Sequence, residues 1–263
     1  MKIETITITP AIAEELLKRN TNNRNVKKER VLLYAHEIAN DNWTLNGESI
    51  KISSNGDVLD GQHRLMAIIK ANRSIKTVFI SDLKKDVITT IDTGVNRSGG
   101  DVLSINGVKH SMNISAAITK FTALKIGRKD IRSNLKIRAK CSNTDILKEY
   151  NMNPDYWQTL HNVSVVYYRK WFRILSISDT IAYYAYFNTK FSEEIVNSFF
   201  DSIINRTGNG ELLYDRLLND SLAKRKISTI EKNALVIKCF VNHVNDRIPK
   251  VLVFQKNETF PII

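Results

Sequence analysis

Two hydrophobic periodicities alternate along the first 82 residues. A period of two, typical of half-buried strands, predicts strands over residues 4–9, 48–53, 57–60 and 75–81. A period of 3.6, with apolar side chains on one face, predicts helices over residues 11–20, 26–41 and 61–72. Pro10 is placed where it can open the first of these helices. Strands and helices that alternate in this way predict a small mixed α/β unit.

Polar and glycine-containing runs mark the turns between these elements. Asn46-Gly47 is a hairpin signal ahead of the second strand, and Asn55-Gly56 predicts a turn before the third. The asparagine-rich run 20–25 predicts a loop between the first two helices.

From residue 98 onward the pattern is mostly helical. Ser98, with Asp101 three residues later, resembles the capping box that begins a helix. Apolar positions at helical spacing predict further helices over residues 111–127, 143–151, 157–172, 178–187, 192–206, 211–220 and 228–246. We therefore expect an α+β protein in which a small mixed α/β domain, residues 1–100, precedes a mostly helical domain, residues 101–263.

The composition fits a folded protein with a basic second half. The chain has 263 residues, of which 43% are hydrophobic, enough for one large or two ordinary domains. Its formal net charge is +12, and residues 101–263 hold 24 Lys and Arg against 15 Asp and Glu, whereas residues 1–100 hold 15 against 12. This excess fits a polyanion such as DNA as partner, and it equally fits general solubility.

Cysteine use and hydropathy indicate a cytoplasmic protein without a membrane partner. Cys141 and Cys239 form neither a disulfide framework nor a zinc-ligand pattern. The first residues lack the apolar core of a signal peptide. The longest apolar-looking stretch, residues 171–187, contains Arg173 and Asp179 and is too short to cross a bilayer.

Candidate chemistry concentrates in residues 58–69, VLDGQHRLMAII. A strand ends there and a helix begins, so backbone N–H groups and the positive end of the helix dipole meet Gln62, His63 and Arg64. Gly61 leaves room for a ligand to approach the backbone. Free amides, a guanidinium and no steric block together predict a phosphate site.

Asp60 and His63 add acid, base and metal chemistry to this box. Asp60 can hold a Mg²⁺ ion that bridges phosphate oxygens, or accept a proton from a nucleophile. His63 can contact the phosphate or act as acid or base. Alternatively, Asp60 only caps the helix that follows it.

The run from Asp60 to Ala67, DGQHRL followed by methionine and alanine, resembles the signature of DGQHR-domain proteins in the ParB/sulfiredoxin-like superfamily. The resemblance covers about residues 5–105. It implies that the box binds nucleotide phosphates, with Mg²⁺ and either ATP or CTP, as ParB proteins bind CTP and sulfiredoxins and free-serine kinases bind ATP. Gln62 stands where a sulfiredoxin needs a reactive cysteine, which argues against reductase chemistry, and no ParB helix-turn-helix is recognisable.

Other residues match the resemblance less completely. Arg24 ends a polar loop like that of ParB domains and is a candidate second phosphate contact, although the usual proline is absent. Asp92, Thr93 and Arg97 resemble a second box that returns to the phosphate, or they form an interdomain turn. Glu37 is either the counterpart of the kinase branch's glutamate base or a solvated helical residue.

A basic strip, residues 120–140, holds eight Lys or Arg and one acid. Lys125, Arg128, Lys129 and Arg132 are candidate contacts to nucleic-acid phosphates, although such runs are commonly solvated faces. The aromatic residues that could stack on bases are expected to form core instead, because they cluster in apolar helices; they are Tyr167, Tyr168, Trp171, Tyr183, Tyr184 and Tyr186.

We therefore expect a nucleotide-binding, Mg²⁺-dependent protein that uses ATP or CTP as an NTPase, nuclease or kinase in DNA-related processes of a phage or mobile element. A homodimer is compatible with this expectation. One alternative is a non-catalytic DNA-binding regulator that works through its basic half. Another is a phage protein that binds a host factor.

Overall fold

The computed structural model describes residues 1–20, 23, 25–84, 87, 97–126, 141–171, 174–225, 227–255 and 258–263. The protein is α+β and divides into two compact units. The first unit comprises Met1–Asn96 and Arg138–Thr144, and the second comprises Arg97–Ile137 and Asp145–Ile263. The division follows Asn96 and not residue 100, which lies inside a capped helix.

The first unit is built on a mixed sheet. Strands β1 (Lys2–Ile8), β2 (Ser49–Ser53), β3 (Val58–Asp60) and β4 (Ile75–Leu83) form a four-stranded sheet in the order β1-β4-β2-β3 within the described residues. The pairs β1–β4 and β2–β3 are antiparallel, and β2–β4 is parallel. The predicted strands are therefore confirmed, including the short third one.

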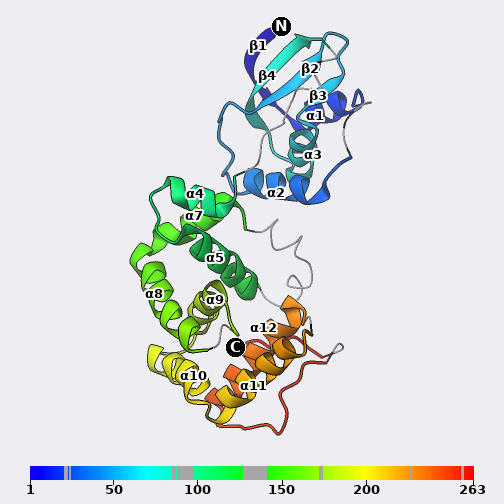
Figure 1. The fold of residues 1–263 in the computed structure, drawn as a ribbon. Helices are drawn as coiled ribbons and strands as arrows, with labels where there is room; N and C mark the ends of the chain where they lie inside the picture. The colour runs from blue at the N-terminus through cyan, green and yellow to red at the C-terminus, as the bar shows by residue number, and fades with distance from the viewer. Residues whose placement is uncertain are drawn as a thin grey trace. The chain divides into compact units, whose positions relative to one another are not determined.

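Three helices cover one face of this sheet (Figure 1). They are α1 (Pro10–Leu17), α2 (Lys28–Ala39) and α3 (Gln62–Ala71). Thr9 caps α1 by accepting a hydrogen bond from the Ile12 amide, and Pro10 occupies the first turn, as predicted. The core between sheet and helices contains Ile8, Ala13, Ala35, Ile38, Ile50, Ile52, Val58, Leu65, Ala67, Ile68 and Ile75.

The second unit consists of helices in its described part. They are α4 (Gly99–Ile105), α5 (Ser111–Ile126), α7 (Asn143–Met152, whose first two residues belong to the first unit), α8 (Pro154–Lys170), α9 (Ile177–Phe187), α10 (Glu193–Asn205), α11 (Gly208–Leu222) and α12 (Thr229–Val244). The Ser98–Asp101 capping box is present as predicted. Among the described residues, no helix combines the length and apolarity needed to cross a membrane.

Aromatic side chains form much of the core of the second unit. Trp171 and Tyr183 are completely buried, and the Phe187 and Phe240 rings stack at 3.7 Å between centroids. Tyr167, Tyr184 and Tyr186 are also buried, while Tyr168 is half-buried. The prediction that these residues form core is confirmed for all of them except Tyr168.

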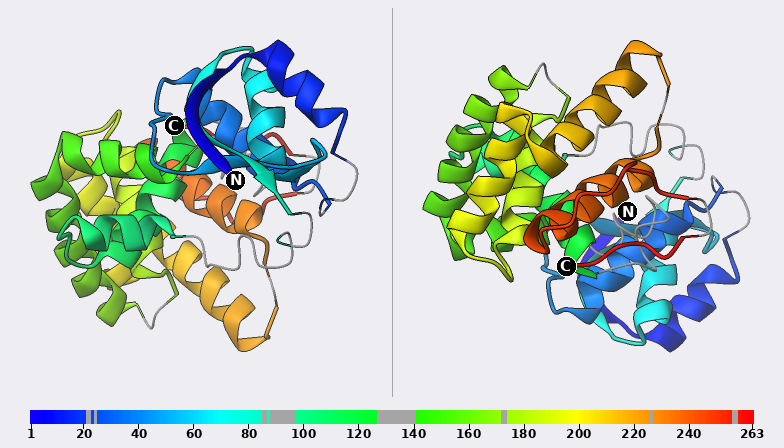
Figure 2. Two further views of the ribbon diagram at one scale, coloured as in Figure 1. Left: turned by 90° about the horizontal axis from the view of Figure 1, so that it is seen from above. Right: turned by 90° about the horizontal axis from the view of Figure 1, so that it is seen from below.

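The described parts of the C-terminal segment lie along the last two helices (Figure 2). Arg216 of α11 donates to the Leu252 carbonyl at 3.0 Å, and Lys238 of α12 donates to the Val253 carbonyl at 2.7 Å. Leu252 and Phe260 are buried by this arrangement. The segment is therefore held by polar side chains of the helices as well as by apolar contact.

A pair of histidines is stacked between the α4–α5 connection and α8. The rings of His110 and His161 lie 3.8 Å apart and are inclined by 12°. His161 is 4% exposed, and burial together with the nearby His110 lowers its pKa. The unfolded chain therefore takes up a proton at His161 at higher pH than the folded chain does.

Acidification is expected to destabilise the second unit through His161. The pKa of His161 is lower in the folded state than in the unfolded state. The contribution of neutral His161 to the free energy of unfolding is therefore complete above the unfolded pKa of about 6.5, and it is lost as the pH falls below that value. Denaturant unfolding at pH 7.5 and pH 5.5 should show a smaller difference for His161→Phe than for the parent. An equal pH dependence in both proteins would remove His161 from this account.

Candidate functional site

A β-bulge in the β2–β3 hairpin fixes the position of Asp60. The hairpin turns at Asn55-Gly56, where the Ser53 amide donates to the Asp57 carbonyl at 2.9 Å and Gly56 has a positive φ of 85°. Ile52 pairs with Val58, but the register then shifts, so that Lys51 pairs with Asp60. Residues that face each other across antiparallel strands point to the same side. The bulge therefore places the lysine directly opposite the carboxylate.

Asp60 is a carboxylate that is held by cations. Its Oδ2 lies 2.8 Å from Lys51 Nζ and 3.8 Å from an Arg64 nitrogen, and its Oδ1 accepts from the Gly61 amide at 2.7 Å. Burial acts to raise the pKa of Asp60, but the Lys51 hydrogen bond and the charges of Arg64 and Lys51 outweigh it and lower the pKa. Asp60 is therefore ionised at neutral pH and suited to orient a cation or a water, not to donate a proton.

Gly61 is required first by the fold. Its φ is 99° and its ψ is 3°, in the left-handed region that favours glycine. A Cβ at this position would lie 3.0 Å from Ile50 Cγ1 and 3.3 Å from Ile50 Cα. The expectation that glycine chiefly makes room for a ligand is therefore incomplete, since the space beside it is filled by β2.

Gly61→Ala is expected to lower the unfolding free energy by about 2 kcal/mol, from left-handed strain and the contact with Ile50. Gly47→Ala is the matched control, because Gly47 also has a positive φ, 85°, but nothing lies within 4 Å of its added Cβ. Denaturant titration should therefore show the smaller loss for Gly47→Ala. Equal losses of unfolding free energy would mean that β2 shifts to accommodate the added methyl group at position 61.

The Asn46-Gly47 turn itself does not form the hairpin that was expected. No strand precedes it among residues 25–45, so it leads from the segment after α2 into β2. The Asn46 side chain accepts from the Glu48 amide at 3.1 Å, which is a local turn contact.

Gln62 faces the asparagine-rich loop. Its Oε1 accepts from Asn20 Nδ2 at 3.2 Å, and the Asn20 Oδ1 accepts from Asn23 Nδ2 at 2.6 Å. Asn23 also donates to the Val58 carbonyl at 2.6 Å. Gln62 is 3% exposed and ties this loop to α3. A phosphate contact from its side chain, as expected from the sequence, has no support in these contacts.

The His63 side chain binds the backbone immediately before α2. Its Nε2 accepts a hydrogen bond from the Lys27 amide at 3.0 Å, and the residue is 4% exposed. This nitrogen acts as an acceptor, so the ring's proton in its neutral form is on Nδ1. His63 can use Nε2 as a base only if the bond to Lys27 breaks.

Arg64 joins α3 to the start of β2. One terminal nitrogen donates to the Ser49 carbonyl at 2.5 Å, and the other pairs with Glu48 Oε2. The Arg64 side chain is 10% exposed, whereas that of Glu48 is 60% exposed. Glu48 can therefore turn into solvent and leave one face of a fixed guanidinium available to an anion.

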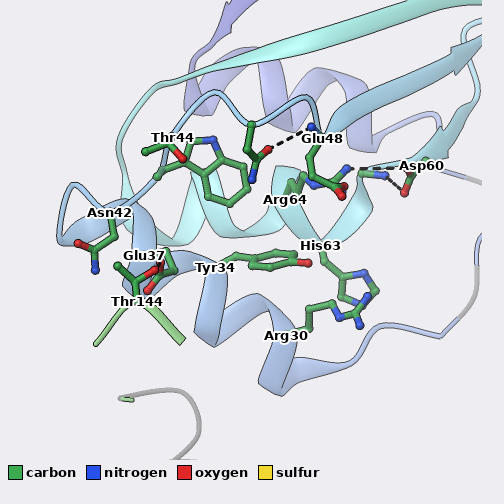
Figure 3. A pocket seen from close by; sticks show the side chains of 13 residues that line it. Arg30, Tyr34, Glu37, Asn42, Thr44, Glu48, Asp60, His63, Arg64 and Thr144 are labelled. Atoms are coloured by element: carbon green, nitrogen blue, oxygen red, sulfur yellow. Dashed lines mark hydrogen bonds and ion pairs between the residues drawn. The ribbon is translucent and has the colours of Figure 1, made fainter. Parts of the chain in front are cut away.

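Box residues and α2 residues line a common pocket of about 290 Å³ (Figure 3). Four of its lining residues come from the box, and they are Asp60, Gly61, His63 and Arg64. The others are Arg30, Tyr34, Glu37, Asn42, Trp43, Thr44, Asn46, Glu48 and Thr144. The structure thus brings most of the predicted box to one cavity, with Gln62 as the exception.

The pocket has two chemically different ends (Figure 3). Basic side chains gather at one end, and they are Arg30, His63 and Arg64. The other end carries Glu37, Asn42 and Thr144, and the Tyr34 ring lies between the two ends. Tyr34 also packs edge to face against Trp43, with ring centroids 5.8 Å apart. The cavity therefore offers guanidinium groups, carboxylates, an aromatic wall and amide groups to one ligand.

On the α2 side of the pocket, sequence reasoning named Glu37 as a candidate base but missed Arg30 and Tyr34. Arg30, Tyr34 and Glu37 are spaced i, i+4 and i+7, so they share one face of α2, and all three line the pocket. That spacing was visible in the sequence. Glu37 is not a solvated residue: its Oε2 accepts from Thr144 at 3.0 Å, and its Oε1 is buried without a hydrogen-bond partner among the described residues.

For most of the remaining candidates for phosphate contacts, the structure offers no test. Arg24, Asp92 and Thr93 lie outside the described residues. Arg97 is exposed and belongs to the second unit, where it immediately precedes the Ser98 cap of α4.

The nucleic-acid candidates are mostly outside the described residues as well, since Arg128, Lys129 and Arg132 all are. Lys125 is exposed near the end of α5, with its Nζ 4.8 Å from the Phe121 ring centroid. Lys120, the first residue of the basic strip, pairs with Asp179 in the interior and does not present its charge to a polyanion.

Comparison with known proteins adds no relative to this picture, because no family model, no curated protein and no solved structure matches the chain.

Proposed function

We propose that the first unit binds a nucleotide in the 290 Å³ pocket. The observation that carries the proposal is the composition of this one cavity. Arg30, His63 and Arg64 lie at one end, the Tyr34 ring lies in the middle, and Glu37, Asn42 and Thr144 lie at the other end. A nucleotide has the same division, with an anionic phosphate chain and a planar base that stacks and forms hydrogen bonds.

The basic end suits the phosphates for three reasons. Guanidinium groups bind phosphate oxygens through paired, charge-assisted hydrogen bonds. Arg64 is held in place by the Ser49 carbonyl, so little conformational freedom is lost when an anion replaces Glu48. The N-terminus of α3 also faces this end through Gly61, and its dipole favours negative charge.

The aromatic wall of the pocket suits the base. Tyr34 and Trp43 are half-buried and meet edge to face, so each exposes part of its ring to the pocket. Aromatic faces of this kind stack on bases with little regard to base identity. The sequence resemblance suggests ATP or CTP, and both belong in the test.

The donor set fits a nucleotide better than a resident metal ion. Asp60 is already paired with Lys51 and lies close to Arg64, so a Mg²⁺ ion would compete with two cations for it. We propose that Mg²⁺ arrives with the nucleotide, with Asp60 and Glu48 as the carboxylates that can hold it. When bound, the ion would neutralise charge on the phosphates during hydrolysis or transfer.

Calorimetric titration with ATP and with CTP, with and without Mg²⁺, tests the proposal. Arg30→Ala should weaken binding by roughly tenfold or more, the worth of a charge-assisted hydrogen bond. Lys28→Ala is the control, because Lys28 is an exposed cation on the same helix that does not line the pocket. No heat with either nucleotide at millimolar concentration, or equal losses in both variants, would contradict it.

A further inference from the structure

The two edge strands of the sheet, β1 and β3, differ in whether their outer backbone groups form hydrogen bonds. The edge at β3 is closed, because the Val58 amide donates to the Arg19 carbonyl at 3.2 Å and the Val58 carbonyl accepts from Asn23 at 2.6 Å. The edge at β1 is open: no described residue forms a backbone hydrogen bond to the outer side of Lys2–Ile8. An open edge of seven residues is a template for another strand.

The first half of β1 is exposed as well as open. Lys2, Ile3, Glu4 and Thr5 are all exposed, and Ile3 keeps 62% of its surface in solvent. The strand contains no proline and pairs with β4 in an unbroken register, so neither a missing amide nor a bulge blocks its outer edge. The far end is less accessible, because Ile8 is buried and the chain turns at Thr9 into α1.

The charges on this strand are self-complementary. Consider two copies of β1 related by a two-fold axis perpendicular to the sheet. Residues that face each other must point to the same side of the sheet, so their residue numbers must both be even or both be odd. If Ile3 faces Ile3 of the second copy, Lys2 of each copy faces Glu4 of the other, which gives two oppositely charged pairs. The next allowed register places Glu4 opposite Glu4 of the second copy, and these two like charges repel each other.

We propose that β1 pairs antiparallel with β1 of a second copy of this chain, with Ile3 on the two-fold axis, to form a continuous sheet across a homodimer. The pairing covers the exposed Ile3 side chains and satisfies the open backbone groups. The existing ion pair of Lys2 with Asp82, 3.6 Å long between exposed groups, contributes little and therefore competes only weakly for the Lys2 ammonium.

Charge exchange tests the register directly. Sedimentation velocity over a concentration series should show a monomer–dimer equilibrium for the parent. Glu4→Lys places Lys opposite Lys twice and should raise the dimer dissociation constant by about tenfold or more. The double variant, Lys2→Glu with Glu4→Lys, exchanges the two charges and should restore dimerisation. Failure of this restoration in a folded double variant would overturn the proposed register.

Disulfide capture tests the axis. Ile3→Cys should form a covalent dimer on mild oxidation, because facing residues of antiparallel strands bring their Cα atoms within disulfide range. Thr7→Cys is the control, since it does not face itself in this register. The native Cys141 and Cys239 are both buried. A parent that stays monomeric at the highest concentration, or equal capture at both positions, would overturn the proposal.

Discussion

Asp179→Asn is expected to lower the unfolding free energy by about 3 kcal/mol or more, because it leaves two lysines facing each other in the interior. Asp179 Oδ1 pairs with Lys120 Nζ, and its Oδ2 lies 3.0 Å from Lys232 Nζ. The three side chains are 16–23% exposed and join α5, α9 and α12. Burial acts to raise the pKa of Asp179, but the two lysines outweigh it and lower the pKa to about 2.

Two further variants separate this effect from a general loss of charge. Asp155→Asn makes the same change on the exposed first turn of α8 and should cost less than about 1 kcal/mol. Adding Lys120→Met to Asp179→Asn should recover part of the loss, because one of the two uncompensated cations is removed. Denaturant unfolding measures all of them. A loss for Asp179→Asn no larger than that for Asp155→Asn would show that solvent already screens the three charges.

Arg64→Ala is expected to have the second largest effect, on both folding and binding. The unfolding free energy should fall by about 2 kcal/mol, because the Ser49 carbonyl loses a charged donor in a buried setting. Nucleotide affinity should fall by about 1.5–3 kcal/mol, the worth of a charge-assisted hydrogen bond. Denaturant unfolding measures the first quantity, and calorimetry at a temperature where the variant stays folded measures the second.

Arg73→Ala is the control for this variant. Arg73 follows α3 and pairs with Asp41 at 2.6 Å, but both side chains are at least half exposed, at 50% and 83%. Such surface pairs contribute about 0–1 kcal/mol, and Arg73 does not line the pocket. If Arg64→Ala destabilises the protein but binds nucleotide as tightly as Arg73→Ala does, Arg64 has a structural role alone.

Local sequence patterns were sufficient to predict the strands and helix starts, but they were insufficient to predict the arrangement of the candidate site. The strands of the first unit, the Pro10 helix start and the Ser98 capping box depend on nearest neighbours in sequence, and these were predicted. Asp60 depends on a bulge: a regular hairpin would have placed Leu59 opposite Lys51. No local pattern indicated that extra residue, so the ion pair that determines the charge state of Asp60 was not foreseen.

The orientation of box residues was also beyond a linear reading. Gln62, His63 and Arg64 are consecutive on α3, so they point about 100° apart from one to the next. They consequently reach three different partners: the Asn20 side chain, the Lys27 amide and the Ser49 carbonyl. A cluster of functional groups in sequence was therefore dispersed in space, whereas the α2 residues that complete the pocket came from another segment.

A titration of the ¹⁵N-labelled protein with ATP and CTP, followed by two-dimensional NMR, tests whether a nucleotide binds in the pocket of the first unit. We expect the Gly61 and Arg64 amides and the Trp43 indole to shift together and to saturate with one dissociation constant, because all three belong to the pocket. The indole signals of Trp157 and Trp171, which are buried in the second unit, should stay in place. Shifts confined to the second unit, or none at millimolar nucleotide, would contradict nucleotide binding at this pocket.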